Sequence, residues 1–171
     1  MDSREQNIHQ HCSWEVTSKL PLSKSELISF LNEIRMAHLA TSAKRGKPRV
    51  SPIWFLYEDG VFYFTTRLSR VKGRHIKANP SVALSIATDE RPYRAVCAFG
   101  RAAIVKEGRD ELLKRISFRY GSKEGKEWLK GAVKQPGRVA VMLKPDRILS
   151  WDYSRGDSER QEKGETMTTR L

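Results

Sequence analysis

Two periods of hydrophobic and polar positions run along the middle of the chain, and they predict one early helix followed by strands. Residues 23–35 carry apolar side chains on one helical face: Leu27, Ile28, Leu31 and Ile34. Ser23, with Glu26 three residues later, is typical of a capping box at the start of such a helix.

Short apolar or alternating runs after this helix predict strands. They occupy residues 36–42, 49–57, 61–66, 81–89, 94–105, 138–145 and 146–153. Asp59 and Gly60 are typical of a tight hairpin turn, so the second and third strands should be antiparallel. Gly100 inside a long run predicts a bulge or a close approach of another chain segment.

Further helices are predicted over residues 69–79, 108–121 and 123–133. The first of these should begin at Ser69 and stop before Pro80. Several short strands with tight turns favour a mainly β fold. We therefore expect an antiparallel β-barrel that closes on itself, with helices packed outside.

The ends of the chain differ from the middle. Residues 21–153 hold the apolar patterns and are predicted to form the domain, whereas 1–20 are expected to be a flexible leader and 154–171 a polar tail. No apolar run has the length of a membrane span or the pattern of a signal peptide. The two cysteines, Cys12 and Cys97, form no disulfide framework, so a reducing cytoplasm is the expected location.

Positive charge is concentrated in the domain. The chain has a formal net charge of +12, while the tail carries four basic and four acidic residues and the leader two basic and three acidic ones. A basic domain attracts anions such as nucleic acid, an anionic membrane or a phosphorylated small molecule. Composition does not choose among these partners.

The segment from Thr65 to Pro80 carries the most informative chemistry. It has five basic residues, Arg67, Arg70, Lys72, Arg74 and Lys77, and three hydroxyl residues, Thr65, Thr66 and Ser69, but no acidic one. Guanidinium, ammonium and hydroxyl groups where a strand leads into a helix N-terminus suit a phosphate. The alternative is a solvated basic helix face.

Three motifs give the chain a family resemblance. They are R-V-S-P-I-W at residues 49–54, F-T-T-x-x-S-R at 64–70, and N-P at 79–80 followed by V-A-L. Their order and spacing resemble those of the pyridoxamine 5'-phosphate oxidase-like family, and the resemblance covers about residues 26–153. It implies an antiparallel split β-barrel that binds FMN and works as an oxidoreductase. It also implies a homodimer with the cofactor site at the subunit interface.

The resemblance also implies which residues contact the cofactor. Those that would line the flavin ring or the strand end beside it are Arg49, Val50, Ser51, Pro52, Ile53, Trp54, Phe64, Thr65 and Thr66. Arg70 matches the arginine that holds the cofactor phosphate, with Lys72, Arg74 and Ser69 beside it. No catalytic side chain and no metal ligand is implied.

Departures from the family pattern bear on the cofactor and the substrate. Vitamin B6 oxidases have a substrate-phosphate lysine at the position of Trp54, and an indole cannot form that ion pair, which argues against pyridoxamine phosphate oxidation. The spacing of Arg70, Lys72 and Arg74 is similar to the branch that binds the deazaflavin F420. The expected cofactor is therefore FMN or F420. A flavin-contacting glutamine is missing near Ala95, where Arg94 could replace it.

Other interpretations remain open. A nucleic-acid-binding module would explain the charge, although no recognition motif is present. A heme-binding split barrel would need an axial ligand, for which His38 and His75 are the candidates. A metal site at His9, His11 and Cys12 has too few ligands. Cys97 is expected to be a small buried hydrophobe.

Overall fold

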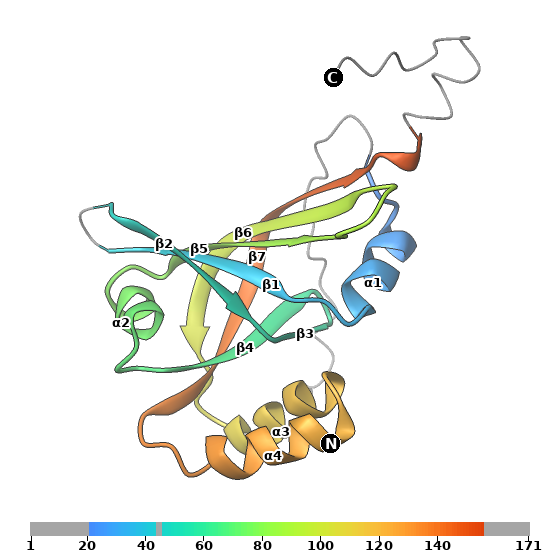
Figure 1. Cartoon of the computed structure of the whole chain (residues 1–171). Coiled ribbons are helices and arrows are strands. Elements are labelled where there is room, and N and C mark those ends of the chain that lie inside the picture. Colours follow the sequence, from blue (N-terminus) through green and yellow to red (C-terminus); the bar gives the residue numbers. More distant parts are fainter. Residues whose placement is uncertain (1–20, 44–45, 156–171) are drawn as a thin grey trace, which may run out of the picture.

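One curled antiparallel sheet with four helices around it forms the structure, a computed structural model that describes residues 21–43 and 46–155 (Figure 1). The predicted leader, and the predicted tail beyond Arg155, lie outside the described residues. The strands are β1 (Ala37–Ser42), β2 (Pro48–Ile53), β3 (Phe55–Glu58), β4 (Val61–Arg67), β5 (Ser81–Ala87), β6 (Arg94–Ile104) and β7 (Arg138–Asp152). The helices are α1 (Lys24–Asn32), α2 (Val71–Ala78), α3 (Arg109–Arg119) and α4 (Ser122–Ala132).

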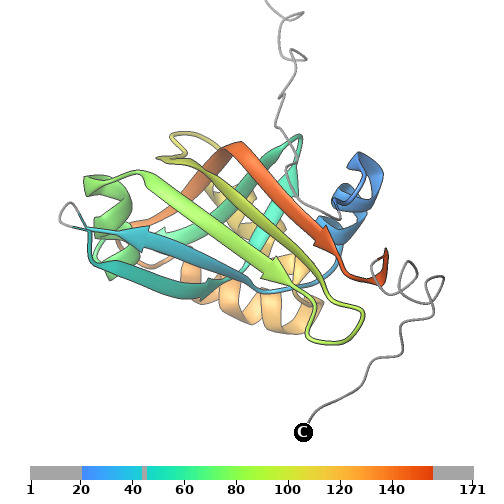
Figure 2. The same cartoon turned by 90° about the horizontal axis from the view of Figure 1, so that it is seen from above.

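The seven strands follow the order β2-β1-β5-β6-β7-β4-β3, and every neighbouring pair is antiparallel. The sheet curls into a half-barrel, with α1 and α2 near opposite ends and α3 and α4 outside β3 and β4 (Figures 1 and 2). The predicted mainly β split barrel is confirmed. Full closure is not seen, because β2 and β3 are the two edges of the sheet.

The predicted strand 49–57 is wrong as one element, because it divides at Trp54. Its first half, β2, pairs with β1, and its second half, β3, pairs with β4. Consecutive residues therefore occupy opposite edges of the sheet, and the chain crosses between them at Trp54. The hairpin turn is confirmed, with positive φ at Asp59 (49°) and Gly60 (80°).

The two final strands predicted from the sequence are one strand, β7. Pro145 was expected to separate them. It lies beyond the pairing of β7 with β4, which ends at Leu143, so β7 is paired with β6 alone at this point. A strand that is paired on one side tolerates a residue without an N–H. The predicted bulge at Gly100 is confirmed by a register shift opposite Pro145. A Cβ at Gly100 would lie 2.6 Å from the Lys144 carbonyl oxygen, which explains the glycine.

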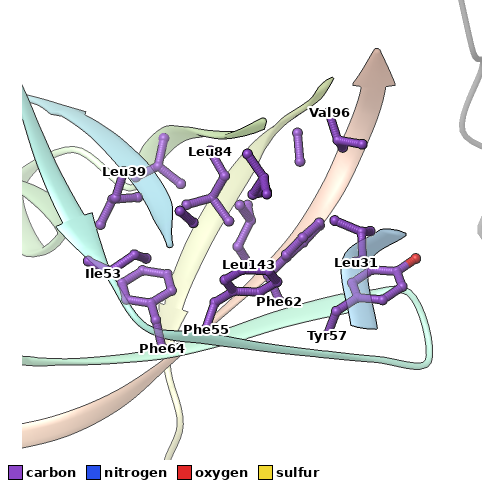
Figure 3. Close-up of a cluster of buried hydrophobic side chains, with 14 of the residues drawn as sticks. Leu31, Leu39, Ile53, Phe55, Tyr57, Phe62, Phe64, Leu84, Val96 and Leu143 are labelled. Carbon is purple, nitrogen blue, oxygen red and sulfur yellow. The ribbon is translucent and has the colours of Figure 1, made fainter. Parts of the chain in front are cut away.

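The core fills the inside of the curled sheet. Side chains from β3, β4, β5 and β7 meet there with Leu31 of α1 (Figure 3). The capping box at Ser23 is confirmed, with Glu26 at the third position. The predicted apolar face of this helix is partly wrong, because Ile28 is 39% exposed and Ile34, at 69%, follows the end of the helix. Phe30 takes their place in the core beside Leu27 and Leu31.

Two glycines allow the helices to pack closely. Gly73 of α2 lies against the end of β4, where a Cβ would come 2.3 Å from the Arg67 carbonyl oxygen. Gly125 of α4 lies against α3, where a Cβ would come 2.2 Å from the Ser117 carbonyl oxygen. No helix in the described part of the chain is long and apolar enough to cross a membrane.

Candidate functional site

A cleft of about 560 Å³ opens where β2, the end of β4 and the start of α2 meet the α4–β7 connection. Its lining is Arg49, Val50, Ser51, Pro52, Ile53, Trp54, Thr65, Thr66, Arg67, Arg70, Val71, Lys72, Trp128, Gln135 and Arg138. The volume lies within the usual range for small-molecule sites. Segments far apart in the sequence therefore build one concave surface.

Most of the residues expected to contact a cofactor lie in this cleft. They are the whole run from Arg49 to Trp54, together with Thr65, Thr66, Arg70 and Lys72. Three of the expected residues, Phe64, Ser69 and Arg74, do not line it. Phe64 is fully buried in the core, and Arg74 is exposed, with its guanidinium donating to the carbonyl of Ser69.

The turn from β4 into α2 brings the basic run to the cleft. The Arg70 N–H donates to the Arg67 carbonyl at 3.0 Å, so the chain reverses tightly after β4. The helix begins at Val71 with Arg70 as its N-cap, which corrects the predicted start at Ser69. Because Gly73 has no side chain, α2 packs on the backbone of Arg67, and its N-terminal end borders the cleft.

Five cations line the cleft: Arg49, Arg67, Arg70, Lys72 and Arg138. The last four affect one another electrostatically, and none of the five forms an ion pair with an acidic residue in the described part of the chain. Burial lowers the pKa of Lys72, and the positive charges of Arg70 and Arg138 lower it further. Burial also lowers the pKa of Arg138, with Arg67 and Arg70 adding to the effect. No aspartate or glutamate is among the described residues that line the cleft. Like charges held together in this way favour a bound anion.

Arg138 is held in place by three neighbours. Its Nη1 donates to Thr65 Oγ1 at 2.9 Å, and its Nε and Nη2 both donate to Gln135 Oε1, at 3.2 and 2.6 Å. Its guanidinium carbon lies 5.0 Å from the ring centroid of Trp128. Each Nη atom keeps a second N–H in addition to these bonds, so the planar fork is positioned to bind an oxyanion.

Two aromatic side chains, Trp54 and Trp128, also line the cleft. Trp54 stacks on Tyr120 with centroids 4.8 Å apart and planes within 4° of parallel. Trp128 lies 5.6 Å from Trp54, tilted by 48°. The Tyr120 hydroxyl accepts from the Phe55 N–H at 3.1 Å and donates to the Arg35 carbonyl at 2.6 Å. These hydrogen bonds fix the position of the crossing between β2 and β3. Burial raises the pKa of Tyr120.

Sequence reasoning did not assign five lining residues: Arg67, Val71, Trp128, Gln135 and Arg138. Arg67 belongs to the basic run, where the charge pattern was a usable signal. Arg138 faces Arg67 across the β4–β7 ladder, and Trp128 and Gln135 lie shortly before it in the chain. Their position could have been predicted from the sequence only if the pairing of β4 with β7 had been known.

The other candidates lie elsewhere. Arg94 donates to Glu33 at 3.0 Å instead of lining the cleft. His38 is exposed and His75 contacts Thr41 at 3.2 Å, so neither lines the cleft. Cys97 is free but only half-buried, which corrects the expectation of a buried residue. The described ranges hold no cluster of His, Cys, Asp or Glu suited to a metal, and His9, His11 and Cys12 lie outside them.

Solved structures share this architecture. A conserved hypothetical protein from Mycobacterium tuberculosis is 23% identical, with a TM-score of 0.68, and the match covers 92% of this chain and 97% of that one. An F420 reductase is 26% identical, with a TM-score of 0.58 and coverage of 78% and 98%. A heme storage protein from Vibrio cholerae is 19% identical, with a TM-score of 0.60 and coverage of 71% and 89%.

None of the curated proteins matches the chain significantly. The pyridoxamine 5'-phosphate oxidase family matches residues 23–152, which span most of the chain and include the strands β1 to β7 and the helices α1 to α4. The motifs at residues 49–54 and 64–70 lie within this match and meet at the cleft. The chain belongs to the pyridoxamine 5'-phosphate oxidase family.

Proposed function

We propose that the protein is an oxidoreductase that binds a flavin-type cofactor, FMN or F420, in this cleft and acts on a small organic substrate as a homodimer. Family membership supports the proposal, and so does the similarity to a structure named F420 reductase. The observation that carries it is the group of five cationic residues in the cleft lining, which no acidic residue of the described lining neutralises. Such a group attracts the phosphate that FMN and F420 share.

The cleft offers different groups to the phosphate and to the ring system of such a cofactor. Arg70 and Lys72, beside the N-terminal end of α2, would hold the phosphate by charge-assisted hydrogen bonds. Thr65 and Thr66, which carry hydroxyl groups, line the same cleft. The edge strand β2 lines the remaining length and offers backbone groups to a ring system.

The residues of the cleft would bind and orient the cofactor, and they set the charge of the cleft. When bound, the cofactor supplies hydride transfer. The described lining residues include no carboxylate and no histidine, so a side-chain acid or base of the usual kind is not part of the proposal. The cations also favour the anionic form of any group that approaches them.

F420 is the cofactor we favour, because it bears a polyglutamate tail in addition to its phosphate. Arg74 and Lys77 are exposed further along α2, whose N-terminal end borders the cleft, and a longer anion could extend towards them. The net charge of +12 is consistent with such a ligand. The similarity to the F420 reductase, at 26% identity, favours the same choice.

A paired titration tests this choice. The full chain is titrated with FMN and with F420 at low and at high salt, and the dissociation constants are compared. F420 affinity should fall more steeply with salt, because exposed charges are screened over about 8–10 Å at physiological ionic strength. Tighter binding of FMN at every salt concentration would exclude F420 and leave FMN as the proposed cofactor. If the protein binds a nucleic-acid duplex but neither cofactor, the proposed function is wrong.

A further inference from the structure

Lys72 differs from the other lysines in the described part of the chain. It is half-buried, whereas the remaining described lysines are all exposed. It lies in the first turn of α2, and it lines the cleft. Lysine is rarely buried unless an acidic group pairs with it, because an ammonium group loses its hydration there. The surroundings of this amine therefore decide what it can do.

Cations surround this amine. Burial lowers the pKa of Lys72, and the charges of Arg70, at the N-cap of α2, and Arg138, on β7, lower it further. Arg49 of β2 and Arg67 of β4 are the other cations of the lining, and the described lining includes no carboxylate. The N-terminal end of α2 adds partial positive charge. All these groups disfavour a proton on Lys72, so its neutral, nucleophilic form is more populated at neutral pH than that of an exposed lysine.

The same cations suit phosphate, and this selects the electrophile that the amine would meet. Arg70 and the free N–H groups at the start of α2 are groups that bind phosphate. Arg138 presents a guanidinium that Thr65 and Gln135 hold in place. A molecule with a phosphate bonded directly to an acyl group would therefore be held with its carbonyl carbon near the Lys72 amine. Guanidinium groups also stabilise phosphate as it leaves.

We propose that Lys72 is a site of acylation by acyl phosphates such as acetyl phosphate. The neutral amine attacks the carbonyl carbon, so that an N–C bond forms, the C–O bond to the phosphate breaks and inorganic phosphate leaves. The nitrogen releases one proton to solvent, and the product is an uncharged amide. No oxidant or reductant is needed. The proposal rests only on that part of the proposed function that assigns phosphate binding to the cleft.

Acylation would remove one of the charges that hold a cofactor phosphate. An amide at Lys72 has no charge, so the cleft would keep its arginines and lose the ammonium group. A phosphate bound in the cleft would in turn compete with the acyl phosphate for the same cations. The cleft would therefore be acylated when it is empty and protected when it is occupied.

Acetylation of the full chain, without added cofactor, tests the proposal. The chain is incubated with acetyl phosphate at neutral pH, and chymotryptic peptides are quantified by mass spectrometry over time. Lys72 should be acetylated at least about tenfold faster than Lys77, which is exposed in the last turn of the same helix. Acetic anhydride, which carries no phosphate, should give a smaller ratio of Lys72 to Lys77 acetylation.

Two controls isolate the contribution of the bound phosphate. Inorganic phosphate should slow the acetylation of Lys72 by acetyl phosphate but not that of Lys77. Arg70→Ala should lower the ratio obtained with acetyl phosphate towards the ratio obtained with acetic anhydride. Arg101→Ala, which removes an exposed arginine of β6 outside the cleft, should leave the ratio unchanged. Circular dichroism checks that both variants fold.

Three results would each overturn the proposal: equal rates at Lys72 and Lys77 with acetyl phosphate, the same ratio with both reagents, or no protection by inorganic phosphate. All three are measured on the unsubstituted protein, so they hold even if a variant fails to fold. FMN or F420 should protect Lys72 as well. If inorganic phosphate protects Lys72 and neither cofactor does, the proposed function is wrong while the acylation site stands.

Discussion

At the scale of single residues, the cleft gathers charge that does not serve stability. Arg67, Arg70, Lys72 and Arg138 repel one another, and burial of Lys72 and Arg138 adds to the cost. No described residue of the lining neutralises them. An arrangement that is unfavourable in the free protein and favourable with an anion is expected of a binding site.

Replacing Arg70 by alanine tests this directly. Charge-assisted hydrogen bonds to phosphate contribute roughly 1.5–3 kcal/mol each, so Arg70→Ala should weaken cofactor binding about tenfold to a hundredfold. The free energy of unfolding should not fall, because repulsion is relieved. Arg101→Ala is the control with the same charge change at an exposed position on β6. Equal effects of the two substitutions on cofactor affinity would show that the cationic cluster is only a solvated basic face.

Single residues also show how far the sequence could predict the site. The basic run and the residues 49–54 were recognisable as motifs, and the structure places most of them in one cleft. Arg138, Gln135 and Trp128 could not be found in this way. They belong to no motif, and their position depends on the β4–β7 pairing and on the packing of α4, which are long-range contacts.

At the scale of elements, local patterns predicted the type of each segment better than its boundaries. Residues 49–57 have the composition of one strand, yet Trp54 divides them because the two halves pair at opposite edges of the sheet. Pro145 indicated a break, yet β7 continues through it because the neighbouring strand β4 has already ended there. Both errors arise because pairing partners are set by tertiary structure.

The packing of α4 on α3 predicts opposite effects of two glycine substitutions in one helix. Gly125→Ala would place a Cβ 2.2 Å from the carbonyl oxygen of Ser117, and this overpacking should lower the free energy of unfolding by roughly 1–3 kcal/mol. A Cβ at Gly131 would meet nothing within 4 Å. Gly131→Ala should therefore leave stability unchanged or raise it by up to about 1 kcal/mol. Urea unfolding measures both, and similar losses in the two variants would contradict the close packing.

A second prediction concerns the link between α1 and the residues after β7. Arg155 donates to both carboxylate oxygens of Glu26, at 2.5 and 2.6 Å. This bond, with help from Ser23, lowers the pKa of Glu26 from 4.5 to about 2. Between these values the unfolded chain binds more protons, so this contribution to stability is present above pH 4.5 and is lost as the pH falls towards about 2.

Acid unfolding of Glu26→Gln measures this contribution. Stability of the variant should fall less steeply than that of the unsubstituted protein between pH 4.5 and about 2, the interval set by the two pKa values of Glu26. Glu107→Gln, at an exposed position that forms no ion pair within the described part of the chain, is the control and should keep the original slope. An identical acid slope in Glu26→Gln would show that the link to Arg155 contributes nothing in solution.

At the scale of the whole molecule, the edge strand β2 leads us to expect a dimer. Val50 is 66% exposed on this strand, which also lines the cleft. An open edge with an exposed apolar side chain is a natural surface for a second chain. Sedimentation at micromolar concentration should give about twice the chain mass of 19.6 kDa. Val50→Asp should shift the protein towards a monomer, and a monomeric original chain that binds cofactor tightly would refute the dimeric site.

Competition among chromophores tests whether the cleft binds a flavin-type cofactor. The full chain is incubated with equimolar FMN, F420 and heme, free ligands are removed by gel filtration, and the visible spectrum of the protein fraction is recorded. A flavin or deazaflavin band should stay with the protein at close to one cofactor per chain. A Soret band in its place, or a protein fraction without colour, would contradict it.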